Sequence, residues 1–349
     1  MNIALLLPNW VGDLTMATPA IRALRQHYPT AHLCGVVKPH LIDLIHGTTW
    51  FDSLIACGHP YWLGRRGFFS TLTTIRKFKP DLIIGLRGSF RTGLLAWASG
   101  GLERVSVGSP TMAKFWHRSV EQAEFPGAKK HGSEVDRYLQ TVKLVGADSE
   151  NRQLELVSTF EGEQLAERFW QRMHLSNHEP VVMINAGTAQ SSARMWPLER
   201  FAQLSKELVD RYQVAVIVNC GPGEQSLARQ IVDLAQRSRV VSLADEPTLS
   251  FGLLKALLRR VRLLVTTDSG PRHIAAAMGT AVVAILGATN PDLTHNYNSL
   301  ESIVRLNLSC SPCHAHHCPL QHLRCLNDLT VAQVLSNVAK LLDKMAQVA

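Results

Sequence analysis

The sequence contains no apolar run near the roughly 18 residues that a membrane-spanning helix needs. Its apolar stretches, such as Ala281–Leu286, are far shorter. The amino terminus has no basic segment of the kind that begins a signal peptide, and the run Ile3–Leu7 ends at Pro8, as expected of a buried strand. Strict G-x-G-x-x-G and Walker patterns are also missing, so NAD- and ATP-binding interpretations lack their fingerprints. These absences favour a cytoplasmic protein.

Charged residues are also few, at 18% of the chain, whereas 46% of the residues are hydrophobic. This balance is typical of a packed globular protein, and 349 residues suggest two domains. The net charge of +8 and the pI of about 9.3 indicate an anionic partner: nucleic acid, an anionic membrane surface or a phosphorylated substrate. The seven cysteines cannot all pair within the chain, and in a reducing compartment we expect thiols or metal ligands.

Short apolar runs alternate with helical patterns along the whole chain, which predicts parallel sheets covered on both faces. We therefore expect an α/β protein with two Rossmann-like, doubly wound domains that face each other across a cleft. The domains are predicted at residues 1–160 and 175–326, followed by a terminal helical segment at 327–349. The predicted strands are Ile3–Leu7, Leu33–Val37, Leu54–Ala56, Leu82–Leu86, Val181–Asn185, Val214–Asn219, Val240–Leu243, Leu263–Thr267 and Val282–Leu286.

Ligands of open α/β sheets bind beyond the carboxyl ends of the strands, so polar residues at these ends are candidates for a functional site. Gly12 and Asp13 follow the first strand and precede the first helix. One interpretation makes Asp13 a helix N-cap, for which aspartate is favoured. The other makes it a general base, because a carboxylate can take the proton of an acceptor hydroxyl that attacks an anomeric carbon.

A second strand end carries Asp268, Ser269, Gly270, Pro271, Arg272 and His273. Pro271 suits the first turn of a helix, and Gly270 allows a ligand to approach the backbone. Backbone N–H groups at a helix start form an anion site, to which Arg272 and His273 add charge or donors. Although such turns also occur in folds without a ligand, this combination favours a diphosphate or sugar site.

Two further strand ends contribute polar residues. Thr188 and Arg194 follow the strand that ends at Asn185, and they have the chemistry to bind and neutralise a leaving diphosphate, although Arg194 also fits a solvated surface charge. Glu224 follows the strand that ends at Asn219. Its carboxylate suits either a ribose hydroxyl or a helix N-terminus.

Basic residues gather in the first half of the chain, on the same half as Asp13, and suggest an acceptor that bears phosphates or carboxylates. The candidate acceptor-binding residues are Arg65, Arg66, Arg91, Arg118 and Arg137.

Four cysteines precede the final helix, with a C-x-x-C pair at Cys310 and Cys313, then Cys318 and Cys325. Thiolates suit zinc, so a structural zinc site is one interpretation. The other is a compact loop of unliganded thiols, because the later spacings are irregular for a zinc ribbon.

The chain resembles the ADP-heptose:lipopolysaccharide heptosyltransferases of glycosyltransferase family 9, with particular likeness to heptosyltransferase II members. The resemblance covers nearly all of the sequence. It is carried by Asn9-Trp10-Val11-Gly12-Asp13 with Thr18-Pro19-Ala20, Gly88-Ser89-Phe90-Arg91-Thr92-Gly93-Leu94-Leu95, Ala193-Arg194-Met195-Trp196-Pro197 and Asp268-Ser269-Gly270-Pro271-Arg272-His273-Ile274-Ala275-Ala276. The chain departs from many members in having Arg194 in place of lysine and Gly187-Thr188 in place of a Pro-Gly turn.

The resemblance implies a GT-B fold, with the acceptor on the first domain, the donor on the second and the C-terminal helix packing back toward the first. It implies an inverting enzyme that needs no metal or cofactor for chemistry and uses ADP-heptose as donor. The implied acceptor is the phosphorylated lipid A core that already bears one heptose, reached by peripheral contact with the inner membrane. Asp13 matches the base, and the donor residues carry over to Thr188, Arg194, Glu224, Asp268, Ser269, Gly270 and His273.

Two other functions stay open. A nucleotide-sugar epimerase shares the architecture but needs no second substrate. A basic nucleotide- or nucleic-acid-binding module would explain the charge but not the paired strand-end sites, so we expect no nucleic-acid partner.

Overall fold

The computed structural model describes residues 1–57, 65–107, 114–120, 132–176, 179–187 and 192–346. Its contacts divide the chain into two compact units, Met1–Val157 and Ser158–Ala349. The side chains of a few residues inside the described elements, including Arg65, Arg66 and Arg118, lie outside the description.

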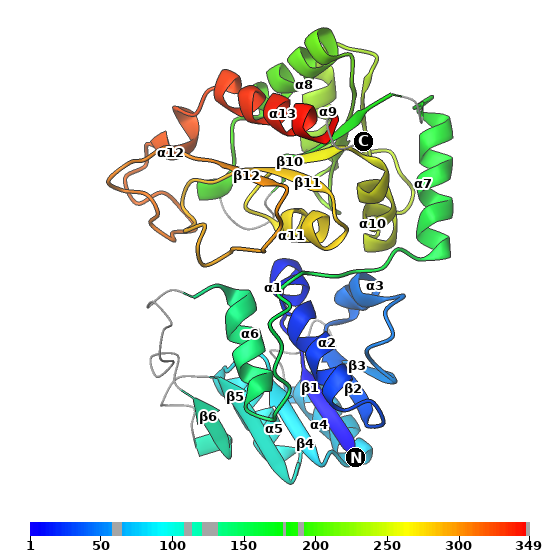
Figure 1. The fold of residues 1–349 in the computed structure, drawn as a ribbon, viewed down its shortest axis with the longest axis vertical. Helices are drawn as coiled ribbons and strands as arrows, with labels where there is room; N and C mark the ends of the chain where they lie inside the picture. The colour runs from blue at the N-terminus through cyan, green and yellow to red at the C-terminus, as the bar shows by residue number, and fades with distance from the viewer. Residues whose placement is uncertain (58–64, 108–113, 121–131, 177–178, 188–191, 347–349) are drawn as a thin grey trace. The chain divides into compact units, whose positions relative to one another are not determined.

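The first unit is built on a six-stranded parallel sheet in the order β3-β2-β1-β4-β5-β6 (Figure 1). Its strands are β1 (Asn2–Leu6), β2 (His32–Val37), β3 (Ser53–Ala56), β4 (Leu82–Gly85), β5 (Glu103–Val107) and β6 (Arg118–Val120). Its helices are α1 (Val11–Met16), α2 (Thr18–His27), α3 (Ile42–Ile45), α4 (Arg65–Phe78), α5 (Phe90–Ala98) and α6 (Glu134–Lys143), with a 3-10 turn at Pro39–Leu41.

The second unit repeats this plan with the order β12-β11-β10-β7-β8-β9, again with parallel pairs. Its strands are β7 (Val181–Asn185), β8 (Ala215–Asn219), β9 (Val240–Ser242), β10 (Leu263–Thr267), β11 (Ala281–Ile285) and β12 (Glu301–Val304). Its helices are α7 (Phe160–Arg172), α8 (Leu198–Tyr212), α9 (Gln225–Ala235), α10 (Phe251–Arg260), α11 (Gly270–Ala277), α12 (Arg324–Asn327) and α13 (Val331–Ala346), with a 3-10 turn at Ser192–Arg194.

Continuous apolar runs form the central strands because helices cover both faces of each sheet. Every residue of β7, β8, β10 and β11 is buried. Serine or threonine N-caps begin several of the covering helices: Ser89 accepts from the Thr92 amide at α5, and Thr159 accepts from the Gly162 amide at α7. The expected α/β fold with two doubly wound sheets is confirmed.

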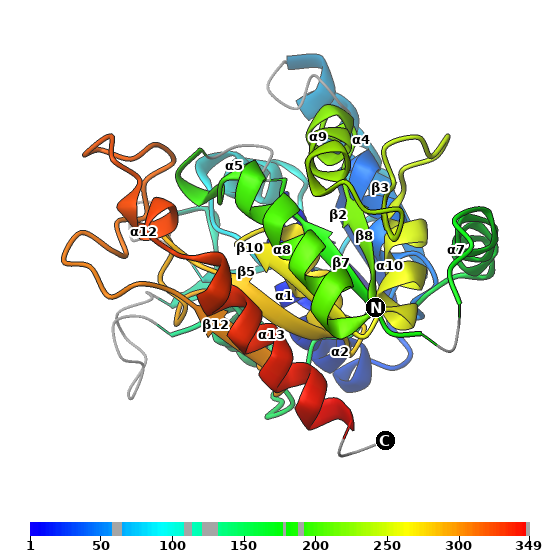
Figure 2. The same cartoon turned by 90° about the horizontal axis from the view of Figure 1, so that it is seen from above.

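The carboxyl-terminal helix α13 packs on the second unit. Its contacts are with α8 and with the strands β10, β11 and β12, and Figure 2 shows α8 and α13 side by side. We expected this helix to pack back toward the first domain. The contacts that the structure describes for α13 are with elements of the second unit. Most of the gap between the two predicted domains, residues 161–174, belongs to α7, which buries Ala166, Phe169 and Trp170 and packs against α10.

Candidate functional site

In both sheets the strand order reverses once, between β1 and β4 and between β7 and β10. At such a switch point the neighbouring crossovers leave on opposite sides, which opens a crevice for ligands at the carboxyl ends of the strands. Asp13 follows β1, and Arg87 follows β4. Arg194 follows β7, and Asp268 follows β10. Each switch point therefore carries one aspartate and one arginine.

Asp13 is the third residue of α1, and its carboxylate forms an ion pair with Arg87. The N-cap position of α1 belongs to Trp10, which makes no side-chain capping bond. The Asp13 side chain keeps 15% of its surface exposed, and that of Arg87 keeps 46%. Asp13 is therefore a carboxylate in the first helical turn that is partly exposed and paired with a solvent-accessible cation.

Helix α6 brings three further titratable side chains toward Asp13. Burial raises the pKa of Glu134, with the charge of Arg137 opposing this effect and that of Asp13 adding to it. Burial and the Asp13 carboxylate also raise the pKa of Tyr138, whose hydroxyl is buried without a hydrogen-bond partner among the described residues. Arg137 forms an ion pair with Glu134. Burial alone would lower the pKa of Arg87, but the charges of Asp13, Tyr138 and Glu134 and the hydrogen bond to Asp13 together raise it.

A row of buried polar side chains crosses the carboxyl edge of the second sheet. Asn219, Asn185 and Thr266 are in register on β8, β7 and β10. Asn219 Nδ2 donates to Asn185 Oδ1 over 2.7 Å, and Asn185 Nδ2 donates to Thr266 Oγ1 over 3.3 Å, to Ser269 Oγ over 3.2 Å and to the Gly187 carbonyl over 3.2 Å. The row therefore ties together the loops that follow β7 and β10.

Helix α11 begins at this edge without a capping side chain. Ser269 occupies the N-cap position, but its hydroxyl bonds Asn185 and Thr266 instead of an α11 amide. Thr267 Oγ1, His273 Nδ1 and Arg194 Nε are buried without hydrogen-bond partners among the described residues. Uncapped amides, the helix dipole and three unmet polar atoms make this edge suited to a polar, anionic ligand.

Asp268 organises the charges around this helix start. It is buried, forms an ion pair of 3.2 Å with Arg194 and accepts a hydrogen bond of 2.7 Å from Thr289 Oγ1. Burial acts against the carboxylate, but Arg272 and Arg194 lower the pKa of Asp268 overall. Burial and the charge of Arg272 lower the pKa of His273 to about 4. His273 is therefore neutral near pH 7. It adds a hydrogen-bonding group to the site but no positive charge.

The loops after β7 and β8 meet through Glu224. Its Oε2 accepts a hydrogen bond of 2.9 Å from the Gly221 amide, and it makes no side-chain cap for α9 although it occupies the N-cap position. A Cβ atom at Gly187 would lie 2.3 Å from the Glu224 carboxylate. Only glycine fits beneath this carboxylate, which lies at the carboxyl edge of the sheet. Thr188 lies outside the described residues.

The structure describes the side chains of two of the five expected acceptor arginines. Arg137 lies beside Glu134 in the group around Asp13, and Arg91 is exposed on α5. The positions Arg65 and Arg66 belong to α4, and Arg118 belongs to β6.

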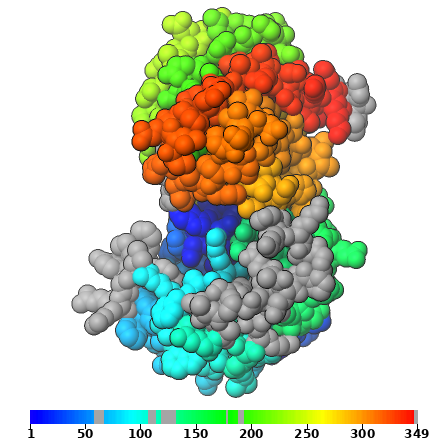
Figure 3. All heavy atoms as spheres, turned by 90° about the vertical axis from the view of Figure 1, so that its left-hand side faces the viewer, coloured from blue at the N-terminus to red at the C-terminus, as the bar shows by residue number. Residues whose placement is uncertain are grey.

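The four cysteines lie in the surface segment that Figure 3 shows in orange beside α13. Burial raises the pKa of Cys325, and the nearby thiols of Cys313, Cys318 and Cys310 add to the effect. The cysteines therefore lie in one neighbourhood. In the part of the chain that the structure describes, no three His, Cys, Asp or Glu side chains have the arrangement of a metal site.

Sequence reasoning missed Tyr138, Glu134, Thr289 and Glu301 as parts of these sites. Arg87 could have been found from the sequence as the first cation after β4. Glu134 and Glu301, by contrast, begin elements that the apolar pattern did not predict. Their place beside Asp13 and Asp268 depends on tertiary packing, for which no local signal exists.

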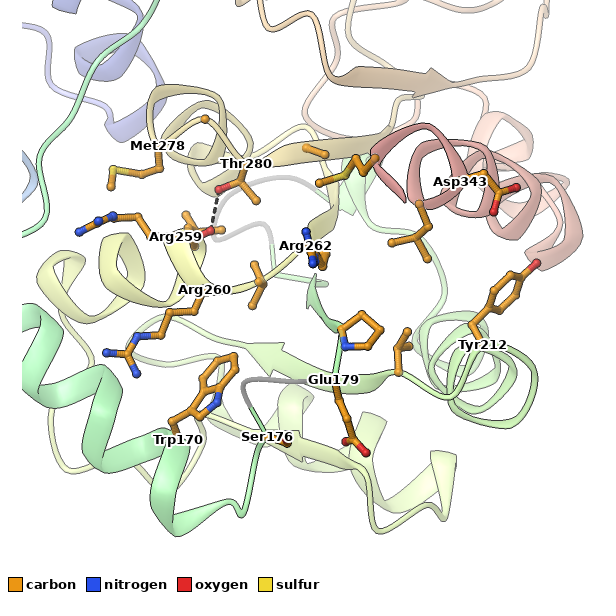
Figure 4. Close-up of a pocket in the computed structure, with 18 residues that line it drawn as sticks. Trp170, Ser176, Glu179, Tyr212, Arg259, Arg260, Arg262, Met278, Thr280 and Asp343 are labelled. Atoms are coloured by element: carbon orange, nitrogen blue, oxygen red, sulfur yellow. Dashed lines mark hydrogen bonds between the residues drawn. The ribbon is translucent and has the colours of Figure 1, made fainter. Parts of the chain in front are cut away.

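A cavity of about 710 Å³ lies elsewhere on the second unit (Figure 4). Its lining includes Pro180, Val214, Arg262 and Ala281, which stand where β7, β8, β10 and β11 begin. None of the described candidate site residues lines it. Because the cavity lies where these strands begin, it is distinct from the site at their carboxyl ends. Two of its cations, Arg259 and Arg260, form ion pairs with Glu163 and Glu167.

Two Rossmann-like units, each with a charged switch point, have the architecture of the GT-B class of glycosyltransferases. Residues 69–324 match the model of glycosyltransferase family 9 (heptosyltransferase), and the chain belongs to this family. It is 25% identical to lipooligosaccharide heptosyltransferase 2 of Campylobacter jejuni over 98% of this chain and 99% of the relative. It also matches the structure of Escherichia coli ADP-heptose LPS heptosyltransferase II, with a TM-score of 0.80 and 20% identity over 99% of this chain and all of that one.

The epimerase alternative has weaker support. The UDP-GlcNAc 2-epimerase from Methanocaldococcus jannaschii matches with a TM-score of 0.54 and 12% identity over 97% of this chain and 92% of that one. The shared architecture explains this likeness.

None of the described helices has both the length and the apolar character that a membrane crossing requires.

Proposed function

We propose that this enzyme transfers heptose, with inversion, from ADP-heptose onto the phosphorylated inner core of lipopolysaccharide. The observation that carries the proposal is the pair of charged switch points: an uncapped helix start beside Asp268 and Arg194 in one unit, and Asp13 paired with Arg87 in the other. The similarity to lipooligosaccharide and lipopolysaccharide heptosyltransferases supports this acceptor, and the similarity to the ADP-heptose LPS heptosyltransferase II of Escherichia coli supports this donor.

The donor diphosphate binds at the start of α11 in this proposal. The amides of Ser269 and Gly270 and the helix dipole attract it, and Arg194 supplies the positive charge. Glu224 lies at the end of the same sheet edge, where its free carboxylate oxygen accepts from a ribose hydroxyl. Asp268 accepts from a sugar hydroxyl, His273 forms a hydrogen bond with the sugar or the phosphate, and Thr188 completes the donor set.

Asp13 acts as the general base. It takes the proton of an acceptor hydroxyl as that oxygen forms a bond to the anomeric carbon, on the face opposite the diphosphate. The bond from the anomeric carbon to the diphosphate oxygen breaks, and ADP leaves with the electron pair. The amides at the start of α11 and Arg194 stabilise the charge that develops on this leaving group.

The anionic groups of the acceptor bind the basic residues around Asp13. Arg87 and Arg137 are beside the base, Arg91 is exposed on α5, and Arg65, Arg66 and Arg118 complete the set. Because this acceptor is lipid-linked, we propose that the enzyme works at the cytoplasmic face of the inner membrane through peripheral contact.

The deciding experiment is calorimetric titration with ADP, ADP-heptose, UDP and a plain UDP-sugar, followed by a transfer assay with the lipid acceptor. Tight binding confined to the adenine nucleotides, and heptose transfer that requires the acceptor, are the expected results. A preference for UDP-sugars would show that the donor is a UDP-sugar and not ADP-heptose. Turnover of a nucleotide sugar without any acceptor would replace the transferase by an epimerase.

We also infer a structural zinc site at Cys310, Cys313, Cys318 and Cys325. The soft donor set and the C-x-x-C pair fit zinc. The backbone amides of Leu323, Leu320, His322 and Gln321 lower the pKa of the Cys318 thiol, which favours the thiolate form that binds a metal. Such a metal would stabilise the segment between β12 and α13 and would take no part in transfer.

A further inference from the structure

A wholly buried arginine lies behind the candidate donor site. Arg272, in the first turn of α11, donates from Nε to Glu301 Oε1 over 2.9 Å and from Nη2 to Glu301 Oε2 over 2.8 Å. Its Nη1 donates to Thr294 Oγ1 over 2.8 Å and to Asp268 Oδ1 over 3.3 Å. Because these bonds direct the guanidinium to protein groups, Arg272 is not placed to bind the diphosphate itself.

Asp268 is shared between two arginines. Its Oδ1 faces the buried Arg272, whereas its Oδ2 faces the partly exposed Arg194 and accepts from Thr289. Arg272 thus fixes one oxygen of the carboxylate and leaves the other for the arginine beside the ligand. This geometry aims Arg194 toward the start of α11.

Glu301 sets the charge balance of this arrangement. A buried charge that loses its partner is strongly unfavourable, so Arg272 needs a buried anion. Glu301 provides it through two hydrogen bonds and is itself buried, with Asn296 Nδ2 donating to its Oε1 over 3.1 Å. With Glu301 in place, Arg272 bonds only one oxygen, Oδ1, of the Asp268 carboxylate.

We propose that Arg272 and Glu301 are a positioning pair, which holds Asp268 so that its second oxygen anchors Arg194 at the donor site. This inference rests on the proposed donor site and adds Glu301 to it. The pair also affects His273: burial and Arg272 lower the pKa of His273, whereas Asp268 and Glu301 oppose them. Removing the Arg272 charge should therefore move the pKa of His273 toward its ordinary value of about 6.5.

The test measures ADP affinity by calorimetry between pH 5.5 and 8 for the full-length wild type, Glu301→Gln, Arg272→Met and the double variant, with thermal unfolding of each. Glu301→Gln should weaken ADP binding by about tenfold, because Arg272 then competes with Arg194 for Asp268. In Arg272→Met, lowering the pH should change the ratio of its ADP affinity to that of the wild type, because His273 then titrates. The control Glu167→Gln removes an ion pair on α7 and should leave ADP affinity unchanged.

The outcomes separate this inference from the proposed function. If the wild type fails to bind ADP, the donor site itself is wrong and the pair has nothing to position. If the wild type binds ADP and the folded variants bind it equally, with the same pH dependence, the pair only stabilises the fold and the inference is overturned. Should the single variants fail to fold, the double variant removes both buried charges, and its ADP affinity should still fall because Asp268 has lost the anchor on Oδ1.

Discussion

Arg194 and Asp268 form an ion pair of 3.2 Å across the switch point of the second sheet, between the loops that follow β7 and β10. Arg87 and Asp13 form the corresponding pair across the switch point of the first sheet. In one pair the buried partner is the carboxylate, which presents its arginine to a ligand. In the other, the carboxylate is the proposed base. The same topology thus supports two different chemical tasks.

Replacing Asp13 by alanine should lower turnover by roughly two to four orders of magnitude, because loss of a general base has effects of this size. ADP affinity should be unchanged, since the proposed donor site belongs to the other unit. Steady-state heptosyl transfer and ADP calorimetry check both points. The control Asp148→Asn removes an exposed carboxylate on the same unit and should be neutral. Near-normal turnover of Asp13→Ala would remove Asp13 as the base.

Replacing Arg87 by methionine should move the acidic limb of the pH profile of kcat/KM to higher pH. The Asp13 carboxylate would lose the cation that stabilises its charged form, so it would bind a proton more readily. The lysine variant keeps the charge and should shift the limb less. An identical profile for wild type, Arg87→Lys and Arg87→Met would show that Arg87 does not act on the base.

Replacing Gly187 by alanine should weaken ADP binding by about tenfold, because the added Cβ would lie 2.3 Å from the Glu224 carboxylate and must displace it. The matched control is Gly132→Ala, since a Cβ at Gly132 meets nothing within 4 Å. Calorimetry with ADP compares the two, and thermal unfolding checks that both are folded. Equal affinities would mean that Glu224 does not contact the nucleotide.

Protein purified without chelator should contain about one zinc ion per chain, as a four-cysteine site binds a single metal. The double variant Cys310→Ser and Cys313→Ser should lose the metal and unfold at a lower temperature, whereas Cys34→Ala, which alters a buried thiol of the first unit, should retain it. Metal analysis and thermal unfolding provide the measurements. Metal-free wild-type protein would leave the cluster as a loop of thiols.

The central parts of both sheets could be predicted from the sequence because their strands are apolar on both faces. Val181–Asn185 and Leu263–Thr267 are confirmed with the predicted bounds. The strands β5, β6 and β12 were missed, since Glu103–Val107, Arg118–Val120 and Glu301–Val304 are short and partly polar. Helix α7 was missed because its apolar residues form only a narrow stripe in a polar segment.

The candidate site divides in the same way. Asp13 and Asp268 could be identified because each lies between a strand and the helix that follows it or in the first turn of that helix, and parallel strands bring their carboxyl ends to one edge. The ion pairs that they form with Arg87 and Arg194 could not be predicted. Arg272 looked like a ligand-binding cation, but tertiary packing buries it against Glu301, which lies far along the chain at the start of an edge strand. Sequence order identifies the strand ends, and only packing determines which charges are already neutralised.

The buried His273 should make the stability of the second unit depend on acid. Its pKa of about 4 in the folded protein lies below the value of about 6.5 expected in the unfolded chain. As the pH falls, the unfolded chain therefore binds the proton first. The stability that comes from neutral His273 is complete above about pH 6.5 and declines as the pH falls toward 4.

At pH 5 this loss is on the order of 2 kcal/mol, which corresponds to about 4–8 °C in unfolding temperature for a domain of this size. Thermal unfolding at pH 7.5 and pH 5 should therefore show a smaller acid-induced drop for His273→Gln than for the wild type, because the variant has no imidazole to titrate. The control His46→Gln alters an exposed histidine of the first unit and should retain the wild-type drop. Equal drops for wild type and His273→Gln would show that His273 is protonated alike in the folded and unfolded chain, and that Arg272 does not keep it neutral.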